Sequence, residues 1–233
     1  MVLQLNRDPL KARPLLCLVT NRSRLPRSAS SDGRAELIAF VGAAARGGID
    51  LIQIRERDLS SRHLYELVRE SVEVAQGTHA RIIVNDRIDV ALAAGAAGVH
   101  LRGDSPDASA ARRIVPGDFL IGRSVHSSAE AAAAANDGEV DYLIAGTVFS
   151  SASKPPGHNL IGIDGLRAIV QLSEVPVLAI GGVTAANIGA TVSTGAAGIA
   201  AIEMFTKAGA NSETLTQVVH KARRAFDTSG RVT

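Results

Sequence analysis

Short β-rich runs and segments with helical spacing alternate along this chain eight times. Nearly every residue in the β-rich runs is apolar, as expected for parallel strands that are covered on both faces. The segments between them are amphipathic, and serines at their starts are the expected helix N-caps. The predicted strands are 15–20, 51–55, 81–85, 98–101, 120–124, 142–146, 175–181 and 198–202, and the expected N-caps are Ser60, Ser105, Ser128 and Ser212.

Eight strand–helix units in 233 residues, with no linker between them, predict a single-domain α/β protein of the TIM (β/α)8 barrel class. We expect residues 1–14 to form an N-terminal extension and residues 15–233 to form the barrel. A doubly wound open sheet is the alternative, but it would normally need fewer units. Only 3% of the residues are aromatic, so Ala, Val, Leu and Ile must fill the core.

Charge and hydropathy exclude several classes of protein. The chain has 25 basic and 23 acidic residues, a balance that argues against a nucleic-acid binder. No apolar run reaches the ~18 residues of a membrane span, and the N-terminal stretch "MVLQLNRDPLKARP" lacks the apolar region of a signal peptide. A single cysteine, Cys17, allows no internal disulfide. We therefore expect a cytoplasmic protein that works apart from membranes, with a homo-oligomer left open.

In a barrel of this class, function lies at the carboxyl ends of the strands and in the loops that follow. Polar residues gather at these positions after nearly every predicted strand. In a strand, alternate side chains share a face, so Gln53, Arg55 and Arg57 should form one row along the inner wall. The other polar positions are Asn85, Asp86, Asp104, Ser124, His126, Lys154 with its neighbouring serines, Gly181, Gly182 and Glu203.

The types of residue at these ends indicate an anionic substrate. Arg55, Arg57 and Lys154 are cations, and arginine suits bidentate contact with phosphate. Two glycines, Gly181 and Gly182, precede a predicted helix, where backbone N–H groups can seat a phosphate. Aspartate supplies the hard oxygen ligands that Mg²⁺ prefers, as in Asp86 and Asp104. Together they predict a site for a phosphorylated small molecule and a metal diphosphate.

Five motifs in order resemble the family that contains thiamin phosphate synthase and thiazole tautomerase. The family pattern is "Q-x-R-x-K", "(I/V)-N-D-R-x-D-x-A-x-x-x-G-A-x-G-V-H-L-G-Q-E-D", "G-x-S", "T-x-T-K" and "A-I-G-G-(I/V)". This chain has "QIRER", "VNDRIDVALAAGAAGVHLRGDSP", "GRS", "SASK" and "AIGGV". The second motif is long and specific, and the resemblance extends over roughly 50 to 205.

The resemblance implies a reaction and roles for residues. Hydroxymethylpyrimidine diphosphate loses pyrophosphate, and the nitrogen of a thiazole phosphate captures the pyrimidine carbocation to give thiamin phosphate. Cations and Mg²⁺ stabilise the leaving group. By position, the pyrimidine would meet Gln53, and the diphosphate would meet Arg55, Arg57, Asn85 and Lys154. Mg²⁺ would bind Asp86 and Asp104, the site would be lined by Ser124, Ser151 and Ser153, and the thiazole phosphate would sit on Gly181 and Gly182.

Four departures from the family pattern keep other functions open. Arg57 replaces a lysine, "RGDSP" replaces "G-Q-E-D", "SASK" replaces "T-x-T-K", and Glu203 stands where a serine is usual. Asp104 matches the metal aspartate only with a one-residue gap; otherwise Ser105 falls there. A tautomerase that uses His126 of "SVHS" as acid and base is the alternative enzyme. A non-catalytic binder of phosphorylated ligands is the alternative from another class.

Overall fold

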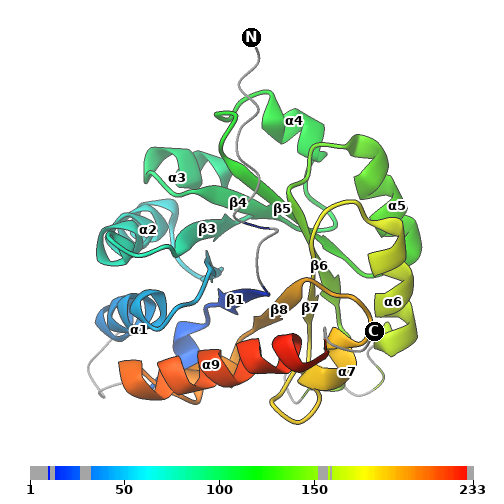
Figure 1. Cartoon of the computed structure of the whole chain (residues 1–233). Helices are drawn as coiled ribbons and strands as arrows, with labels where there is room; N and C mark the ends of the chain where they lie inside the picture. The colour runs from blue at the N-terminus through cyan, green and yellow to red at the C-terminus, as the bar shows by residue number, and fades with distance from the viewer. Residues whose placement is uncertain (1–9, 11–13, 27–32, 152–156, 158, 230–233) are drawn as a thin grey trace.

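Eight parallel strands close into a barrel in the computed structural model, with helices around the outside (Figure 1). The structure describes residues 10, 14–26, 33–151, 157 and 159–229. Each strand pairs with its neighbours in chain order, and β1 pairs with β8. The strands are β1 (Leu15–Val19), β2 (Leu51–Ile54), β3 (Arg81–Asn85), β4 (Gly98–Leu101), β5 (Leu120–Val125), β6 (Tyr142–Gly146), β7 (Val177–Ile180) and β8 (Gly198–Ala201). The chain is a single-domain TIM barrel, as predicted.

Helices follow the strands and cover their outer faces. A short 3-10 helix, Arg22–Arg24, lies between β1 and α1, and an additional four-residue helix follows β8 directly. The helices are α1 (Arg34–Arg46), α2 (Ser61–Ala75), α3 (Ile88–Ala93), α4 (Ala108–Arg112), α5 (Ser128–Asp137), α6 (Gly162–Leu172), α7 (Ile188–Val192), α8 (Glu203–Thr206) and α9 (Ser212–Ser229). Every one of them in the described part of the chain is too short or too polar to span a bilayer.

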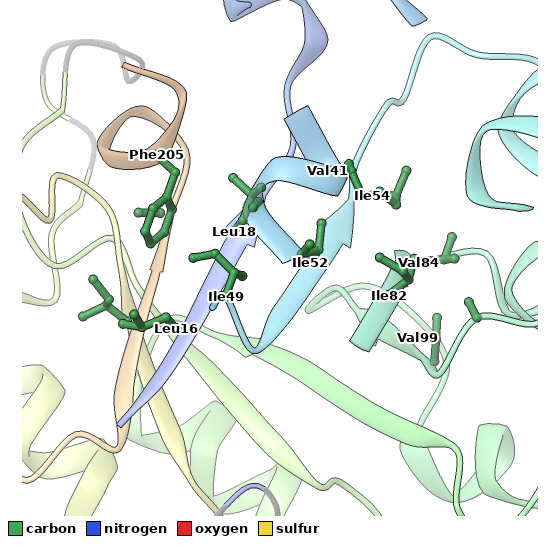
Figure 2. Packing of buried hydrophobic residues seen from close by; sticks show 14 of the residues in the cluster. Leu16, Leu18, Val41, Ile49, Ile52, Ile54, Ile82, Val84, Val99 and Phe205 are labelled. Atoms are coloured by element: carbon green, nitrogen blue, oxygen red, sulfur yellow. The ribbon is translucent and has the colours of Figure 1, made fainter. Parts of the chain in front are cut away.

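Strand residues alternate between two apolar clusters. The outer cluster lies between the strands and the helices and contains Leu16, Leu18, Ile52 and Phe205 (Figure 2). The inner cluster fills the barrel and includes Leu15, Cys17, Val19, Leu51, Ile83, Tyr142 and Leu178. This alternation means that Gln53, two residues after Leu51, points into the barrel. Leu10, from the expected N-terminal extension, is 6% exposed and belongs to the inner cluster.

Two buried aspartates tie the amino ends of the strands together. Asp50 precedes β2, and its carboxylate accepts a hydrogen bond from the Leu16 N–H at 2.9 Å and pairs with Arg223 of α9 at 2.8 Å. Asp141 precedes β6, and its carboxylate accepts from the Ile121 N–H at 2.8 Å and pairs with Arg112 of α4 at 2.7 Å. These contacts fix strand positions at the end of the barrel opposite the polar residues.

Candidate active site

Gln53 and Asn85 form a hydrogen-bonded pair at the carboxyl ends of β2 and β3. The Gln53 Nε2 group donates to Asn85 Oδ1 at 3.0 Å, and Gln53 is 3% exposed. Arg55 continues the same inward row just beyond the strand, and its backbone N–H donates to the Thr20 hydroxyl at 2.9 Å. Arg57 does not extend the predicted row, because β2 ends at Ile54 and Arg57 lies in an exposed turn.

A buried carboxylate, Glu56, joins the loop after β1 to the end of β2. Thr20 Oγ1 donates to Glu56 Oε1 at 2.8 Å, and the Arg22 guanidinium lies 3.1 Å from Glu56 Oε2. Arg22 also makes a two-point contact with Asp58, at 2.6 Å for each bond, which raises the pKa of Arg22. Glu56 lines the same cavity as Arg55 and Arg57. The sequence did not predict this anchoring role. The feature that could have indicated it is a carboxylate shortly after an apolar strand.

Positive charge concentrates beside this anchor. The pKa of Arg55 is lowered, first by burial and then by the neighbouring charges of Arg57 and Arg102. Arg57 and Arg102 are therefore each close enough to repel the Arg55 guanidinium, and a bound anion would relieve that repulsion. Arg55 and Arg57 line a cavity of about 270 Å³ between the loops after β1 and β2, which is formed by Asn21–Ser23 and Arg55–Asp58. Arg102 was not among the predicted site residues, although it directly follows β4.

The two aspartates predicted to hold a metal flank the Arg102 guanidinium. Asp86 lies 3.6 Å from it and Asp104 lies 2.5 Å from it. Asp86 has a left-handed backbone with φ of 65°, which is uncommon outside glycine and frequent at functional sites. The Ser105 hydroxyl donates to the Asp86 carboxylate in a short contact. Among the described residues, no cluster of three or more His, Cys, Asp and Glu side chains could hold a metal ion.

His126 and Ser124 both lie at the carboxyl end of β5 and make different contacts. His126 is exposed, its Nδ1 contacts the Gly146 carbonyl oxygen at the end of β6, and its backbone N–H donates to Glu130 at 2.8 Å. With Nδ1 engaged by a carbonyl, Nε2 is the ring nitrogen left to face solvent. Ser124 points into the barrel and lies 2.8 Å from Nε2 of His100.

The glycines after β7 pack against the loop after β6. Gly181 and Gly182 have φ of 98° and 62°, and a Cβ on Gly182 would lie 2.3 Å from the Ser150 carbonyl oxygen. The Phe149 N–H donates to the Gly181 carbonyl at 2.9 Å, so the two loops are joined. The predicted helix does not begin directly after these glycines, because α7 starts only at Ile188. The glycines bend the chain here rather than open a helix.

The unusual carboxylate at the end of β8 is neutralised by cations. Glu203 forms a short ion pair with Arg24 from the loop after β1, and Lys207 lies 3.6 Å away. These pairs reduce the repulsion that Glu203 would exert on a phosphate nearby. Arg24 and Arg22 are both engaged by carboxylates, so each connects the first loop to another part of the barrel mouth.

Three predicted site residues belong to the loop after β6. Lys154 and Ser153 lie outside the described residues, whereas Ser151 is described and partly exposed.

A larger cavity, about 650 Å³, lies at the opposite end of the barrel, at the starts of β5 to β7. Residues such as Arg81, Asp141 and Leu172 line it. We favour the smaller cavity as the candidate site, because it adjoins the carboxyl ends of the strands, where the polar side chains gather.

Comparison with known proteins places this geometry in a family. The thiamine monophosphate synthase family matches residues 16–205. The chain is 41% identical to a thiamine-phosphate synthase of Chloroflexus aurantiacus, over 73% of this chain and 78% of that protein. It is 37% identical to a thiamine-phosphate synthase of Caldanaerobacter subterraneus, over 84% and 91%. The structure of a thiamine phosphate pyrophosphorylase from Pyrococcus furiosus superposes with a TM-score of 0.78, at 31% identity, covering 93% of this chain and 98% of that chain. The barrel, the polar ends of its strands and these matches lead to one conclusion: the chain belongs to the thiamine monophosphate synthase family.

Proposed function

We propose that this protein is a thiamin phosphate synthase, which couples hydroxymethylpyrimidine diphosphate to a thiazole phosphate and releases pyrophosphate. The observation that carries the proposal is the half-buried Arg55 guanidinium, whose pKa is lowered by burial and by the positive charges of Arg57 and Arg102. It follows the Gln53–Asn85 hydrogen-bonded pair at the ends of β2 and β3. A diphosphate would meet fixed positive charge there, while an uncharged ring would meet amide groups.

The reaction breaks the bond between the pyrimidine methylene carbon and the diphosphate oxygen, and the electron pair leaves with the diphosphate. The thiazole nitrogen then bonds to that carbon. Arg55 and Arg57 stabilise the charge that develops on the leaving group, with Asn85 and Lys154 as further diphosphate contacts. Gln53 orients the pyrimidine. The site is lined by Ser124, Ser151 and Ser153, and the backbone of Gly181 and Gly182 receives the thiazole phosphate.

Asp86 and Asp104 are the residues that would hold Mg²⁺. The chemistry of the donor set supports this assignment, because two carboxylates converge on one cation, Arg102. Mg²⁺ is commonly bound by one or two carboxylates together with substrate phosphate oxygens. When bound, Mg²⁺ would neutralise charge on the departing diphosphate. The Ser105 hydroxyl holds one oxygen of Asp86, and Arg102 is a rival cation for both carboxylates.

The test is to incubate the purified protein with hydroxymethylpyrimidine diphosphate, thiazole phosphate and Mg²⁺, and to measure thiamin phosphate and pyrophosphate. We expect equal amounts of both products. Arg55→Ala should reduce the rate by at least about a hundredfold, because a charged contact to the leaving group is lost. Arg69→Ala is the matched control, since Arg69 lies on the exposed face of α2 and pairs only loosely with Glu73, at 3.9 Å.

The outcomes separate the proposal from its alternatives. Absence of thiamin phosphate in the wild-type reaction would contradict the proposal. Interconversion of thiazole tautomers that disappears in His126→Ala would instead identify a tautomerase. Binding of thiazole phosphate without either reaction would identify a non-catalytic binder.

A further inference from the structure

A buried histidine, His100, lies inside the barrel below the candidate site. It is 2% exposed and comes from β4, next to Asn85 in the strand register. Its Nε2 lies 2.8 Å from the Ser124 hydroxyl oxygen, and its ring stacks on Tyr142 with 5.7 Å between ring centroids. Its other ring nitrogen, Nδ1, is fully buried and has no hydrogen-bond partner among the described residues.

The surroundings of the ring decide where its proton lies. Burial lowers the pKa of His100 to about 3, so the ring is neutral and carries one N–H. An N–H at Nδ1 would be a buried donor without an acceptor, which is rarer and more costly than an acceptor without a donor. The proton therefore belongs on Nε2, where it is donated to Ser124.

The same reasoning fixes the Ser124 hydroxyl. A hydroxyl has one proton and accepts through its lone pairs. Since Ser124 accepts from His100 Nε2, its own proton must point away from the ring. Ser124 is partly exposed, and no second partner is recorded for its hydroxyl among the described residues. Its O–H is then directed at whatever occupies the barrel mouth.

The ring is held in place by close packing. Tyr142 from β6 fills the space beside His100, and this space exists because residue 122 is a glycine: a Cβ there would lie 2.1 Å from Cζ of Tyr142. Gly122 is the register partner of both His100 and Tyr142. The stacking on Tyr142 therefore sets the plane of the imidazole, with Nε2 at the edge that meets Ser124.

We propose that His100 is a positioning residue that makes the Ser124 hydroxyl a hydrogen-bond donor toward an acceptor atom of the pyrimidine diphosphate substrate. The identity of the substrate rests on the function proposed above. The acceptor is a ring nitrogen or a diphosphate oxygen. His100 has no contact with the substrate itself and acts only through Ser124.

The tautomer can be measured without any reaction. Protein labelled with [15N]histidine would give a long-range 1H–15N spectrum, with the His100 signals identified by their loss in His100→Gln. We expect protonated Nε2 and bare Nδ1, unchanged between about pH 6 and about pH 8. Protonation at Nδ1, or a ring that titrates in this range, would overturn the proposal.

Ligand binding tests whether the Ser124 hydroxyl donates to the substrate. We would titrate inorganic pyrophosphate with Mg²⁺, and separately hydroxymethylpyrimidine, into the wild type, Ser124→Ala, His100→Met and the double variant. We expect Ser124→Ala and His100→Met each to weaken the same one of these ligands roughly five- to tenfold, and the double variant to lose no more than Ser124→Ala alone. Which ligand is weakened tells whether the acceptor is on the ring or on the diphosphate.

Two further variants separate positioning from packing. His100→Gln keeps an N–H donor at similar reach and should restore most of the affinity. Tyr142→Phe removes a hydroxyl that has no hydrogen-bond partner in the described part of the chain, and it should leave affinity unchanged. Unchanged affinity for both ligands in His100→Met, or losses that add in the double variant, would contradict the proposal. If only the proposed function were wrong, the result would differ: His100 would be protonated at Nε2 and the ligands would bind, but no thiamin phosphate would form.

Discussion

The Arg102 guanidinium contacts two carboxylates, with Nη1 lying 3.6 Å from Asp86 and Nη2 lying 2.5 Å from Asp104. An arginine therefore stands in this structure between two groups that would otherwise attract a divalent cation. The Arg102 side chain is 40% exposed, so solvent screens these attractions.

Arg102→Ala should increase the affinity for Mg²⁺ in the presence of pyrophosphate. Loss of a rival cation should strengthen Mg²⁺ binding by up to about fivefold, since exposed ion pairs contribute up to ~1 kcal/mol. Titration calorimetry, with Mn²⁺ as a paramagnetic probe in a parallel experiment, would measure it. Arg69→Ala is the control, because Arg69 lies on the exposed face of α2 and pairs with Glu73 rather than with either aspartate. Asp104→Ala should abolish Mg²⁺-dependent turnover, and unchanged turnover would remove Asp104 from the metal assignment.

Glu56→Gln should destabilise the protein and weaken substrate binding. The Glu56 side chain is 3% exposed and contacts Thr20 and Arg22, so its neutralisation removes a buried negative charge that pairs with Arg22. We expect a loss of about 2–3 kcal/mol in the free energy of unfolding, measured by urea titration, and a raised KM. Asp58→Asn removes an exposed contact of the same arginine and should cost less than about 1 kcal/mol. Equal effects of the two variants would show that Glu56 has no special anchoring role.

Gly182→Ala should destabilise the fold and separate the loops after β6 and β7. An alanine would have to adopt φ of 62° and would place its Cβ 2.3 Å from a backbone oxygen. We expect a cost of about 2–4 kcal/mol, again from urea titration. Gly189→Ala is a matched control, because no heavy atom lies within 4 Å of a Cβ built there. A stability of Gly182→Ala close to that of the control would refute the packing argument.

The Cys17 thiol should be inert in the folded protein. Burial raises its pKa from 9.0 to about 12, so the native thiol stays protonated where an unfolded thiol ionises. The unfolded state therefore releases a proton first, and the free energy of unfolding should fall as pH rises above about 9 toward about 12. Cys17→Ala should flatten that part of the pH profile. A disulfide reagent at about pH 8 should react only as fast as the protein unfolds, and rapid labelling of the native state would contradict burial.

The sequence predicted the barrel well because each strand is a short apolar run between polar or glycine-rich turns. Strands 81–85, 98–101 and 142–146 have the predicted bounds, and the others differ by one or two residues. The cap at Ser60 was right, since its hydroxyl accepts from the His63 N–H at 3.3 Å. The cap of α5 is Ser127 rather than the neighbouring Ser128, and its hydroxyl accepts from the Glu130 N–H. The helix α4 starts after Asp107 rather than after Ser105, whose hydroxyl is engaged by the Arg102 N–H and by Asp86.

Side-chain partners were harder to predict, since they join residues far apart in the chain. The row that contains Gln53 could be derived from alternation alone. The contacts of Arg22 with Glu56, Arg24 with Glu203, and Arg102 with Asp86 could not, because long side chains from different loops choose among several carboxylates. For Arg57 the prediction from alternation did not apply, because β2 ends at Ile54 and side chains beyond a strand need not alternate.

The ties at Asp50 and Asp141 repeat atom for atom, four strands apart. Arg223 donates to the Pro14 and Gly48 carbonyls as it binds Asp50, and Arg112 donates to the Phe119 and Glu139 carbonyls as it binds Asp141. Each arginine comes from the half of the ring that does not contain its aspartate. Neither half-barrel is thus complete alone. Two fragments separated between α4 and β5 would each contain a buried aspartate whose arginine partner lies on the other fragment, and reassociation of the fragments should restore stability.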